Sequence, residues 1–325
     1  MRRRKFITLL GSAAIWPLAA SAQQNANITR IGFLGPASAS SWADRLEAFR
    51  VGLRGLGYAE GQNIVIVSRW ADEKYNRLPG LAAELVNLKV NVIVTYGTPG
   101  TLAAMRATKT IPIVMAYSGD ALSAGLVTSL ARPGGNVTGS TYFLSELMAK
   151  RLERLKAAMP HITKAAVLVN PNNPLFGTTL KALEIAAKSL NVDLQQFKVS
   201  GPSEFEAAFL ALAKERVEAV VIQEDAVFVS NMSTIVDLAS KHRLPLAGFN
   251  ELAEAGGLIG YGVDFLAMCR RAAVFVGAIL KGDQPANIPV EQATKFAFVI
   301  NLKTAKRLNL EIPRGLVLAA NEVIE

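Results

Sequence analysis

Polar side chains recur at one kind of position in this sequence, directly after a short apolar run and directly before a segment with helical periodicity. The residues so placed are Thr98, Ser118, Asp120, Asn173, Asp225 and Asn250. Unpaired N–H groups and the helix dipole favour an anionic group at a helix N-terminus. Together these residues therefore suit a small anion or a zwitterion, although each one alone is equally well explained as a helix cap.

The elements that must position these residues are strands whose carboxyl ends meet at one edge. Ile31–Gly35 is followed by a helical segment, a strand, a second helix and the strand Asn91–Gly97. The same order begins again at Ala165–Asn170 and ends at Glu218–Gln223. This pattern predicts an α/β protein with two Rossmann-like lobes, each a parallel sheet with helices on both faces, joined by a hinge. Ligands of such sheets bind at the carboxyl ends of the strands, which here face a cleft.

Several helix starts are expected at these strand ends. Ser41-Trp42-Ala43-Asp44 has the pattern of a capping box. Thr98 and Asn173 each precede a proline, which suits an N-cap followed by the first helical residue, and Asp225 can cap the helix after its own strand.

Composition limits the class of protein. The chain has 325 residues, of which 51% are hydrophobic and 19% charged, enough for two domains with full cores. The net charge is +9, but Arg2, Arg3, Arg4 and Lys5 lie in a segment without acidic residues. The other charges are mixed in sign and form no basic stripe with aromatic residues, so we expect no nucleic-acid partner.

The N-terminus has the pattern of an export signal. A basic start precedes the apolar stretch Phe6–Ala20, and Ala20-Ser21-Ala22 forms a small-residue cleavage site. We expect residues 1–22 to be removed after Ala22. Arg3-Arg4 favours the twin-arginine route over general secretion. Because Cys269 is the only cysteine, the cleavage site carries no lipid-modified cysteine, and we expect a soluble periplasmic protein.

Catalytic motifs are missing from the sequence. His161 and His242 do not lie in a metal-ligand cluster, and no glycine segment has phosphate-loop or dinucleotide spacing. Ser118-Gly119 lacks the glycines of a nucleophile elbow. We therefore expect a binding protein without metal or cofactor, not an enzyme.

Five longer motifs carry a family resemblance: Ala48–Tyr58 with Glu60–Ile64, Val94–Pro99, Leu130–Gly139, Glu254–Leu258 and Val299–Ala305. From about Ile31 to its C-terminus, the chain resembles the ABC transporter substrate-binding proteins that include tryptophan- and tyrosine-type binding proteins. The resemblance implies a type I periplasmic-binding fold, whose lobes close on a small ligand and present it transiently to an ABC permease in the inner membrane. It implies lobe 1 at 28–142 plus 266–283 and lobe 2 at 143–262 plus 288–325, in a monomer.

The resemblance also implies roles for individual residues. A ligand α-carboxylate would meet Thr98 and nearby N–H groups with help from Ser118, and the ammonium would meet Asp225, with Asp120 as the rival acid. Tyr96 and Tyr117 would stack on an apolar ligand side chain. The full set of expected ligand-binding residues is Ser38, Ser41, Tyr96, Gly97, Thr98, Tyr117, Ser118, Asp120, Asn170, Asn173, Asp225, Asn250 and Tyr261.

The ligand itself stays open at this point. Gln223-Glu224-Asp225 stands where relatives with established amino-acid ligands often carry a threonine before the aspartate, and Asn170–Asn173 lacks a glutamate that they often have. An amino acid or a related carboxylate is the expected ligand. The alternatives are a secreted two-lobed enzyme with Asp120 or Asp225 as acid or base, and a sensor module for a membrane receptor.

Overall fold

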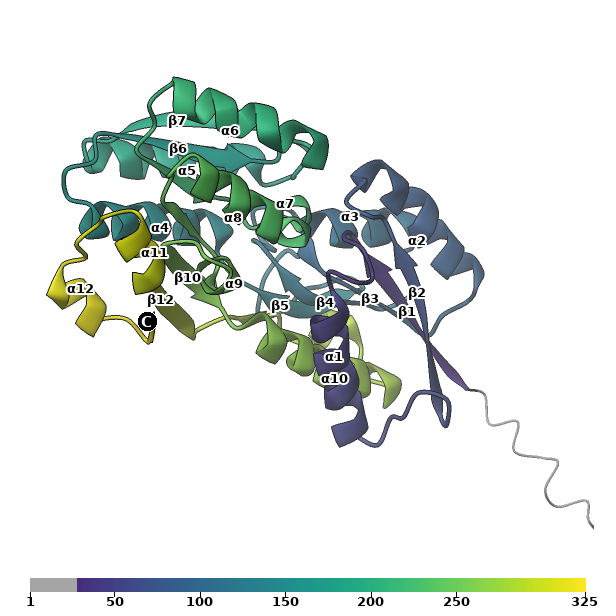
Figure 1. Ribbon diagram of the computed structural model, residues 1–325. Helices are drawn as coiled ribbons and strands as arrows, with labels where there is room; N and C mark the ends of the chain where they lie inside the picture. Colours follow the sequence, from purple (N-terminus) through teal and green to yellow (C-terminus); the bar gives the residue numbers. More distant parts are fainter. Residues whose placement is uncertain (1–27) are drawn as a thin grey trace, which may run out of the picture.

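The computed structural model describes residues 28–325. The expected export signal at residues 1–22, its cleavage after Ala22 and the Arg3-Arg4 motif lie outside the described residues. Within them, no helix is long and apolar enough to cross a membrane. Figure 1 shows two lobes side by side, with the chain passing between them more than once.

The first lobe is built on a six-stranded sheet in which every pair of neighbours is parallel. Two of its central strands begin with Ile and Val residues, at Val92–Thr95 and Ile113–Ser118, and are almost entirely buried, as a sheet covered by two helical layers requires. In spatial order they are β11 (Glu291–Gln292), β5 (Val137–Thr141), β4 (Ile113–Ser118), β3 (Val92–Thr95), β1 (Thr29–Gly35) and β2 (Ile64–Trp70).

Two helix pairs cover this sheet. α1 (Ala43–Gly55) and α10 (Phe265–Leu280) share one core, and α2 (Leu78–Asn87) with α3 (Gly97–Ala107) share the other. α1 and α10 approach closely at Gly52, where an added Cβ would lie 2.5 Å from the Arg270 carbonyl oxygen. Cys269 is fully buried in the same layer.

The second lobe has a seven-stranded sheet. All its neighbours are parallel except β10 and β12, which pair antiparallel because the chain enters β12 from the first lobe. The strands in spatial order are β13 (Glu322–Ile324), β12 (Phe296–Asn301), β10 (Ile259–Val263), β9 (Leu246–Gly248), β8 (Ala219–Ile222), β6 (Lys164–Val169) and β7 (Asp193–Lys198).

Helices cover both faces of this sheet as well. α4 (Leu144–Ala158) and α5 (Phe176–Ser189) pack on one face, and α6 (Phe205–Lys214), α7 (Ala226–Ser230) and α8 (Met232–Lys241) on the other. The remaining short helices are α9 (Asn250–Glu254), α11 (Leu302–Arg307), α12 (Arg314–Leu318) and the 3-10 turns η1 (Tyr75–Arg77), η2 (Pro202–Glu204) and η3 (Pro285–Asn287). Two α/β lobes with largely parallel sheets confirm the expected fold class.

The chain crosses between the lobes after β5, after β10 and after β11. The expected start of the second-lobe segment at residue 288 is wrong, because the last crossing comes later in the chain. Val290 N–H donates to the Leu130 carbonyl and Ala293 N–H donates to the Thr141 carbonyl, so residues up to Ala293 are held on the first lobe.

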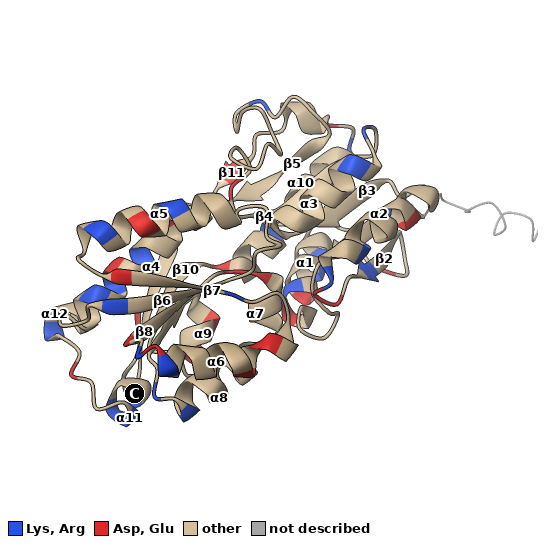
Figure 2. Cartoon of the chain, turned by 90° about the horizontal axis from the view of Figure 1, so that it is seen from above, with Lys and Arg blue, Asp and Glu red and all other residues tan. Residues whose placement is uncertain are grey.

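Charges are mixed over the described surface. In the view of Figure 2, basic and acidic residues are interspersed on the helices of both lobes. A nucleic-acid-binding protein would carry a continuous basic patch for the phosphate backbone.

Candidate functional site

A cavity lies between the lobes at the carboxyl ends of the strands, with an empty volume of about 620 Å³ including its opening. The first lobe contributes residues that follow β1, β2, β3 and β4, and the second contributes residues that follow β6 and β8. Tyr142 and Phe265, at two of the lobe crossings, complete the lining. We call this space the interlobe cavity.

The N-terminus of α3 forms one polar part of the lining. Gly97 has φ +67°, a conformation that glycine adopts readily, and it lets the chain turn from β3 straight into the helix. α3 therefore begins at Gly97, so Thr98 is its second residue and not the expected N-cap. The Thr98 hydroxyl lies 3.2 Å from the Ser118 hydroxyl at the end of β4. The first N–H groups of the helix, which have no intrahelical partner, are available to an anion here.

Asp225 forms the second polar part, on the opposite lobe. It caps α7 as expected, with Oδ1 accepting from Val227 N–H at 3.0 Å. Oδ1 also accepts from Asn170 Nδ2 at 2.9 Å, and Oδ2 accepts from Asn173 Nδ2 at 2.8 Å. Burial raises the pKa of Asp225, and these hydrogen bonds act in the opposite direction. Asn173 itself is not the helix cap that the sequence predicts, since α5 starts at Phe176.

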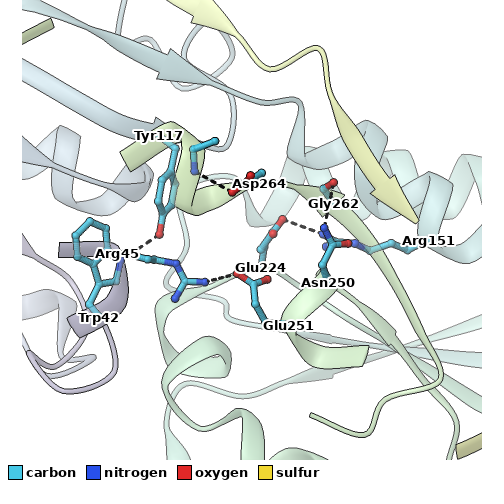
Figure 3. A network of polar contacts seen from close by, with 10 residues as sticks. Trp42, Arg45, Tyr117, Arg151, Glu224, Asn250, Glu251, Gly262 and Asp264 are labelled. Atoms are coloured by element: carbon cyan, nitrogen blue, oxygen red, sulfur yellow. Dashed lines mark hydrogen bonds and ion pairs between the residues drawn. The ribbon is translucent and has the colours of Figure 1, made fainter. Parts of the chain in front are cut away.

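Two ion pairs, one buried and one partly exposed, lie at the hinge end of the cavity (Figure 3). Arg151 Nη2 donates to Glu224 Oε2 at 3.0 Å, and Arg151 Nε donates to the Tyr261 carbonyl at 2.8 Å. Arg45 Nη2 on α1 donates to Glu251 Oε1 on α9 at 2.7 Å, across the lobes. Each of these pairs joins one positive and one negative side chain, so neither pair adds net charge to the cavity. Asp225 has no ion-pair partner among residues 28–325, so it is the uncompensated carboxylate of the cavity.

Aromatic rings form the walls between these polar parts. Trp42 and Tyr96 stack with centroids 4.3 Å apart and planes at 13°. Trp42 Nε1 donates to the Tyr117 hydroxyl at 3.2 Å, and Tyr117 in turn contacts Phe265, with ring centroids 4.5 Å apart. Burial raises the pKa of Tyr96 and Tyr117, so both hydroxyls stay neutral. This wall matches a flat apolar group.

The structure brings together most of the residues expected from sequence. Seven of them line the interlobe cavity: Ser41, Tyr96, Gly97, Thr98, Tyr117, Asn173 and Asp225. Ser118 and Asn170 lie behind these and hydrogen-bond to Thr98 and Asp225. Ser38 donates to the Ser41 hydroxyl at 2.9 Å. Ser41 does not cap α1, which begins at Ala43 without a side-chain cap, and its hydroxyl instead meets Ser230 of the other lobe at 3.0 Å.

The other three expected residues neither line the cavity nor hydrogen-bond to the expected residues that do. Asp120, the rival acid, is occupied by its own turn, because its carboxylate accepts from the N–H groups of Leu122 and Ser123 at 3.0 Å and from the Ser123 hydroxyl. Asn250 begins α9, and its side chain points to the Gly262 carbonyl. The Tyr261 ring stacks on Phe296, with centroids 6.1 Å apart.

Several lining residues were missed from sequence: Trp42, Arg45, Tyr75, Tyr142, Glu224 and Phe265. Arg45 could have been identified from sequence, because it stands beside Leu46 at the edge of the apolar face of α1. A charged residue at such a position suggests a buried ion pair or a ligand contact. Tyr142 and Phe265 lie at the expected crossings, where chain segments of both lobes meet. Tyr75 follows β2 and lies beside Asp225; burial first, and then the Asp225 charge, raise its pKa.

The fold agrees with comparisons to known proteins. Residues 31–324 match the family model described as ABC transporter substrate binding protein. Over 266 residues the chain is 29% identical to a tyrosine-binding protein of Clostridioides difficile (strain R20291), covering 82% of this chain and 76% of that protein.

Solved structures show the same architecture. The ABC domain from Streptococcus pneumonia in complex with L-Trp matches with a TM-score of 0.84 at 25% identity, covering 91% of this chain and 99% of that one. A ligand-free, open substrate-binding protein from Clostridium difficile matches with a TM-score of 0.64 at 23% identity, covering 92% and 99%.

Proposed function

This chain belongs to the ABC transporter substrate-binding protein family, and we propose that its interlobe cavity captures an aromatic amino acid. Members of the family bind substrates for transport and are not enzymes, which confirms the expectation of a binding protein over the two-lobed enzyme.

The observation that carries the proposal is the uncompensated Asp225 carboxylate opposite the open N-terminus of α3. An α-amino acid presents an ammonium and a carboxylate on one carbon. Asn170, Asn173 and Val227 occupy three of the roughly four acceptor sites of the Asp225 carboxylate, and the Tyr75 hydroxyl also hydrogen-bonds to it. The ammonium can therefore bind Asp225 by taking the place of the Tyr75 hydroxyl. The α3 N–H groups and the Thr98 hydroxyl, positioned by Ser118, suit the carboxylate.

The walls supply the second half of the proposal. The rings of Trp42, Tyr96 and Tyr117 and the Phe265 ring beside them leave a flat apolar surface for the ligand side chain. The names of the relatives agree with this chemistry, since one is a tyrosine-binding protein and another was solved with L-Trp.

The wider role follows from the same premise. We infer that the protein acts in the periplasm as a monomer after export, and that the closed, liganded form docks transiently on an inner-membrane permease. A ligand-sensing role for a membrane receptor is the alternative. Stimulation of a permease's ATPase activity by the liganded protein supports transport and contradicts a purely sensory role.

A thermal-shift panel tests the ligand class. The protein is first unfolded, dialysed and refolded to remove any retained ligand, and then mixed with L-Trp, L-Tyr, L-Phe or 3-phenylpropionate, which lacks the ammonium. A ligand at 100 times its Kd stabilises the fold by about 2.7 kcal/mol. We expect at least one amino acid to raise Tm and 3-phenylpropionate to have no effect. Equal shifts for both kinds of compound, or no shift for any, would contradict the proposal.

A further inference from the structure

Glu224 brings a second carboxylate to the interlobe cavity, and half of that carboxylate is unused. The residue is only 6% exposed and lines the cavity. Its Oε2 accepts from Arg151, whereas its Oε1 is buried and has no hydrogen-bond partner within residues 28–325. A buried acceptor without a donor costs free energy, so such an atom in a binding cavity points to a donor that arrives with the ligand.

The carboxylate cannot turn away to relieve this cost. Arg151 is fully buried and is itself fixed, because its Nε donates to the Tyr261 carbonyl and its Nη1 contacts Met148 Sδ at 3.4 Å. Rotation of Glu224 would break a buried ion pair, which is strongly destabilising. The Oε1 atom is therefore held in place at the hinge end of the cavity (Figure 3).

The surroundings leave this atom to the ligand. Tyr142 also lines the cavity near Glu224 but forms no hydrogen bond with it among the described contacts. The nearby Arg45–Glu251 pair uses one atom of each partner, and Arg45 Nε and Glu251 Oε2 are buried without partners too. The hinge end of the cavity thus contains polar atoms that can hydrogen-bond to a ligand, whereas the walls formed by the Trp42 and Tyr96 rings are apolar.

Resting on the proposed function, we propose that Glu224 Oε1 accepts a hydrogen bond from a donor on the ligand side chain. The site then selects an aromatic amino acid whose ring carries an O–H or N–H group and discriminates against phenylalanine. Asp225 and the N-terminus of α3 would bind the ammonium and the carboxylate that all α-amino acids share. Glu224 would distinguish their side chains by the hydrogen-bond donor on the ring. A ligand without the donor would leave Oε1 buried and unpaired, which is how a polar site rejects an apolar analogue.

Matched ligands test this specificity by calorimetry. L-Tyr is compared with L-Phe, which lacks the ring hydroxyl, and with O-methyl-L-tyrosine. L-Trp is compared with 1-methyl-L-tryptophan. Each methyl analogue replaces the donor hydrogen by a methyl group, so L-Phe is the analogue that removes the donor without adding volume. We expect the donor-bearing member of at least one set to bind about tenfold or more tightly than its analogues. Equal affinities within both sets would overturn the inference while leaving amino-acid binding intact. If none of the five compounds binds, both the inference and the proposed function are overturned.

Variants then assign the discrimination to Glu224. Glu224→Gln keeps an acceptor for Arg151 and changes the free atom, and Glu224→Leu with Arg151→Met replaces the whole ion pair by apolar groups, which proteins often tolerate. Both should reduce the affinity ratio toward one. Asp120→Asn, a buried acid outside the cavity, is the matched control and should keep the wild-type ratio. An unchanged ratio in Glu224→Gln would overturn the assignment even if the double variant fails to fold.

Discussion

At the scale of single residues, the state of Asp225 decides how the cavity treats a ligand. The carboxyl is buried among neutral donors, and burial raises its pKa from 3.8. A ligand ammonium requires the ionised form. An amino acid must therefore displace the proton whenever the pH is low enough for Asp225 to hold one.

This produces a pH dependence with a defined sign. Ligand affinity should fall as the pH is lowered from 7 toward 4, and calorimetry in buffers of different ionisation enthalpy should show proton release. In the ligand-free protein the sign is opposite: because the folded-state pKa is raised, stability from this group is full below 3.8 and is lost as pH rises through the folded value. Burial raises the pKa of Glu224 as well, so Glu224 also contributes to the pH dependence. The contribution of Asp225 is therefore obtained by subtracting the pH profile of Asp225→Asn from that of the wild-type protein. Identical pH profiles for the two proteins would contradict this assignment.

Residue identity alone could not rank the two candidate acids from sequence. Asp225 and Asp120 both follow a strand and precede a helix-like segment. The structure separates them by their hydrogen-bond partners. The Asp120 carboxylate accepts from the N–H groups of Leu122 and Ser123, which lie two and three residues further along the chain. An Asp side chain can accept from the backbone two residues on, but this general preference does not tell a closed turn from a helix cap or a ligand site. Asp225 instead receives amides that lie more than fifty residues away, which no local pattern reveals.

At the scale of elements, the start of α3 depends on one glycine. Gly97→Ala forces a residue with a Cβ into φ +67° and should destabilise the protein by about 1 kcal/mol. Because the helix N-terminus shifts, ligand affinity should fall too. Gly80→Ala in α2 is the control: it meets no atom within 4 Å and should be neutral or slightly stabilising. Chemical denaturation measures both, and equal effects would contradict the role given to Gly97.

The contact between α1 and α9 holds the lobes together. Arg45 and Glu251 are 2.7 Å apart with side-chain exposures of 11% and 30%, so their coupling is screened less than that of a surface pair. A double-mutant cycle with Arg45→Met and Glu251→Leu should give a coupling of about 1 kcal/mol or more in ligand-binding free energy. The same cycle on Arg54 and Glu47, both 52% exposed on α1, should give less than about 0.5 kcal/mol. Equal coupling for both pairs would show that lobe closure does not use Arg45.

At the scale of the whole molecule, the two-lobed fold was predictable because its signals are local and repeated. Apolar runs of strand length alternate with helical periodicity in each half, and each strand end is marked by polar residues. The lobe-to-lobe contacts were not predictable. Arg45 and Glu251 are 206 residues apart and pair across the cleft, so their contact depends on how rigid lobes meet. Arg151 and Glu224 lie in the same lobe, but they are 73 residues apart and come together only through its tertiary packing. The late crossing after β11 was missed for the same reason, since a two-residue strand has no periodicity to read.

Closure of the lobes should be visible in solution. Within residues 28–325, only a few side-chain hydrogen bonds and ion pairs bridge the cleft, such as Arg45–Glu251 and Ser41–Ser230, so the ligand must supply much of the closing free energy. We expect the radius of gyration measured by small-angle X-ray scattering to decrease when a bound aromatic amino acid saturates the refolded protein. Asp225→Asn at the same ligand concentration should show a smaller decrease. A radius that is unchanged in wild type at saturation would contradict hinge closure.

The central claim, that Asp225 holds the ammonium of an amino-acid ligand, is tested most directly by calorimetric titration of Asp225→Asn beside Asp120→Asn. The ligand is whichever of L-Trp, L-Tyr and L-Phe binds the wild-type protein most tightly, and circular dichroism confirms that both variants fold. Loss of the buried charge partner should weaken binding at least thirtyfold in Asp225→Asn, or about 2 kcal/mol, and leave Asp120→Asn within about threefold of wild type. Equal affinities of wild type and Asp225→Asn would contradict the claim.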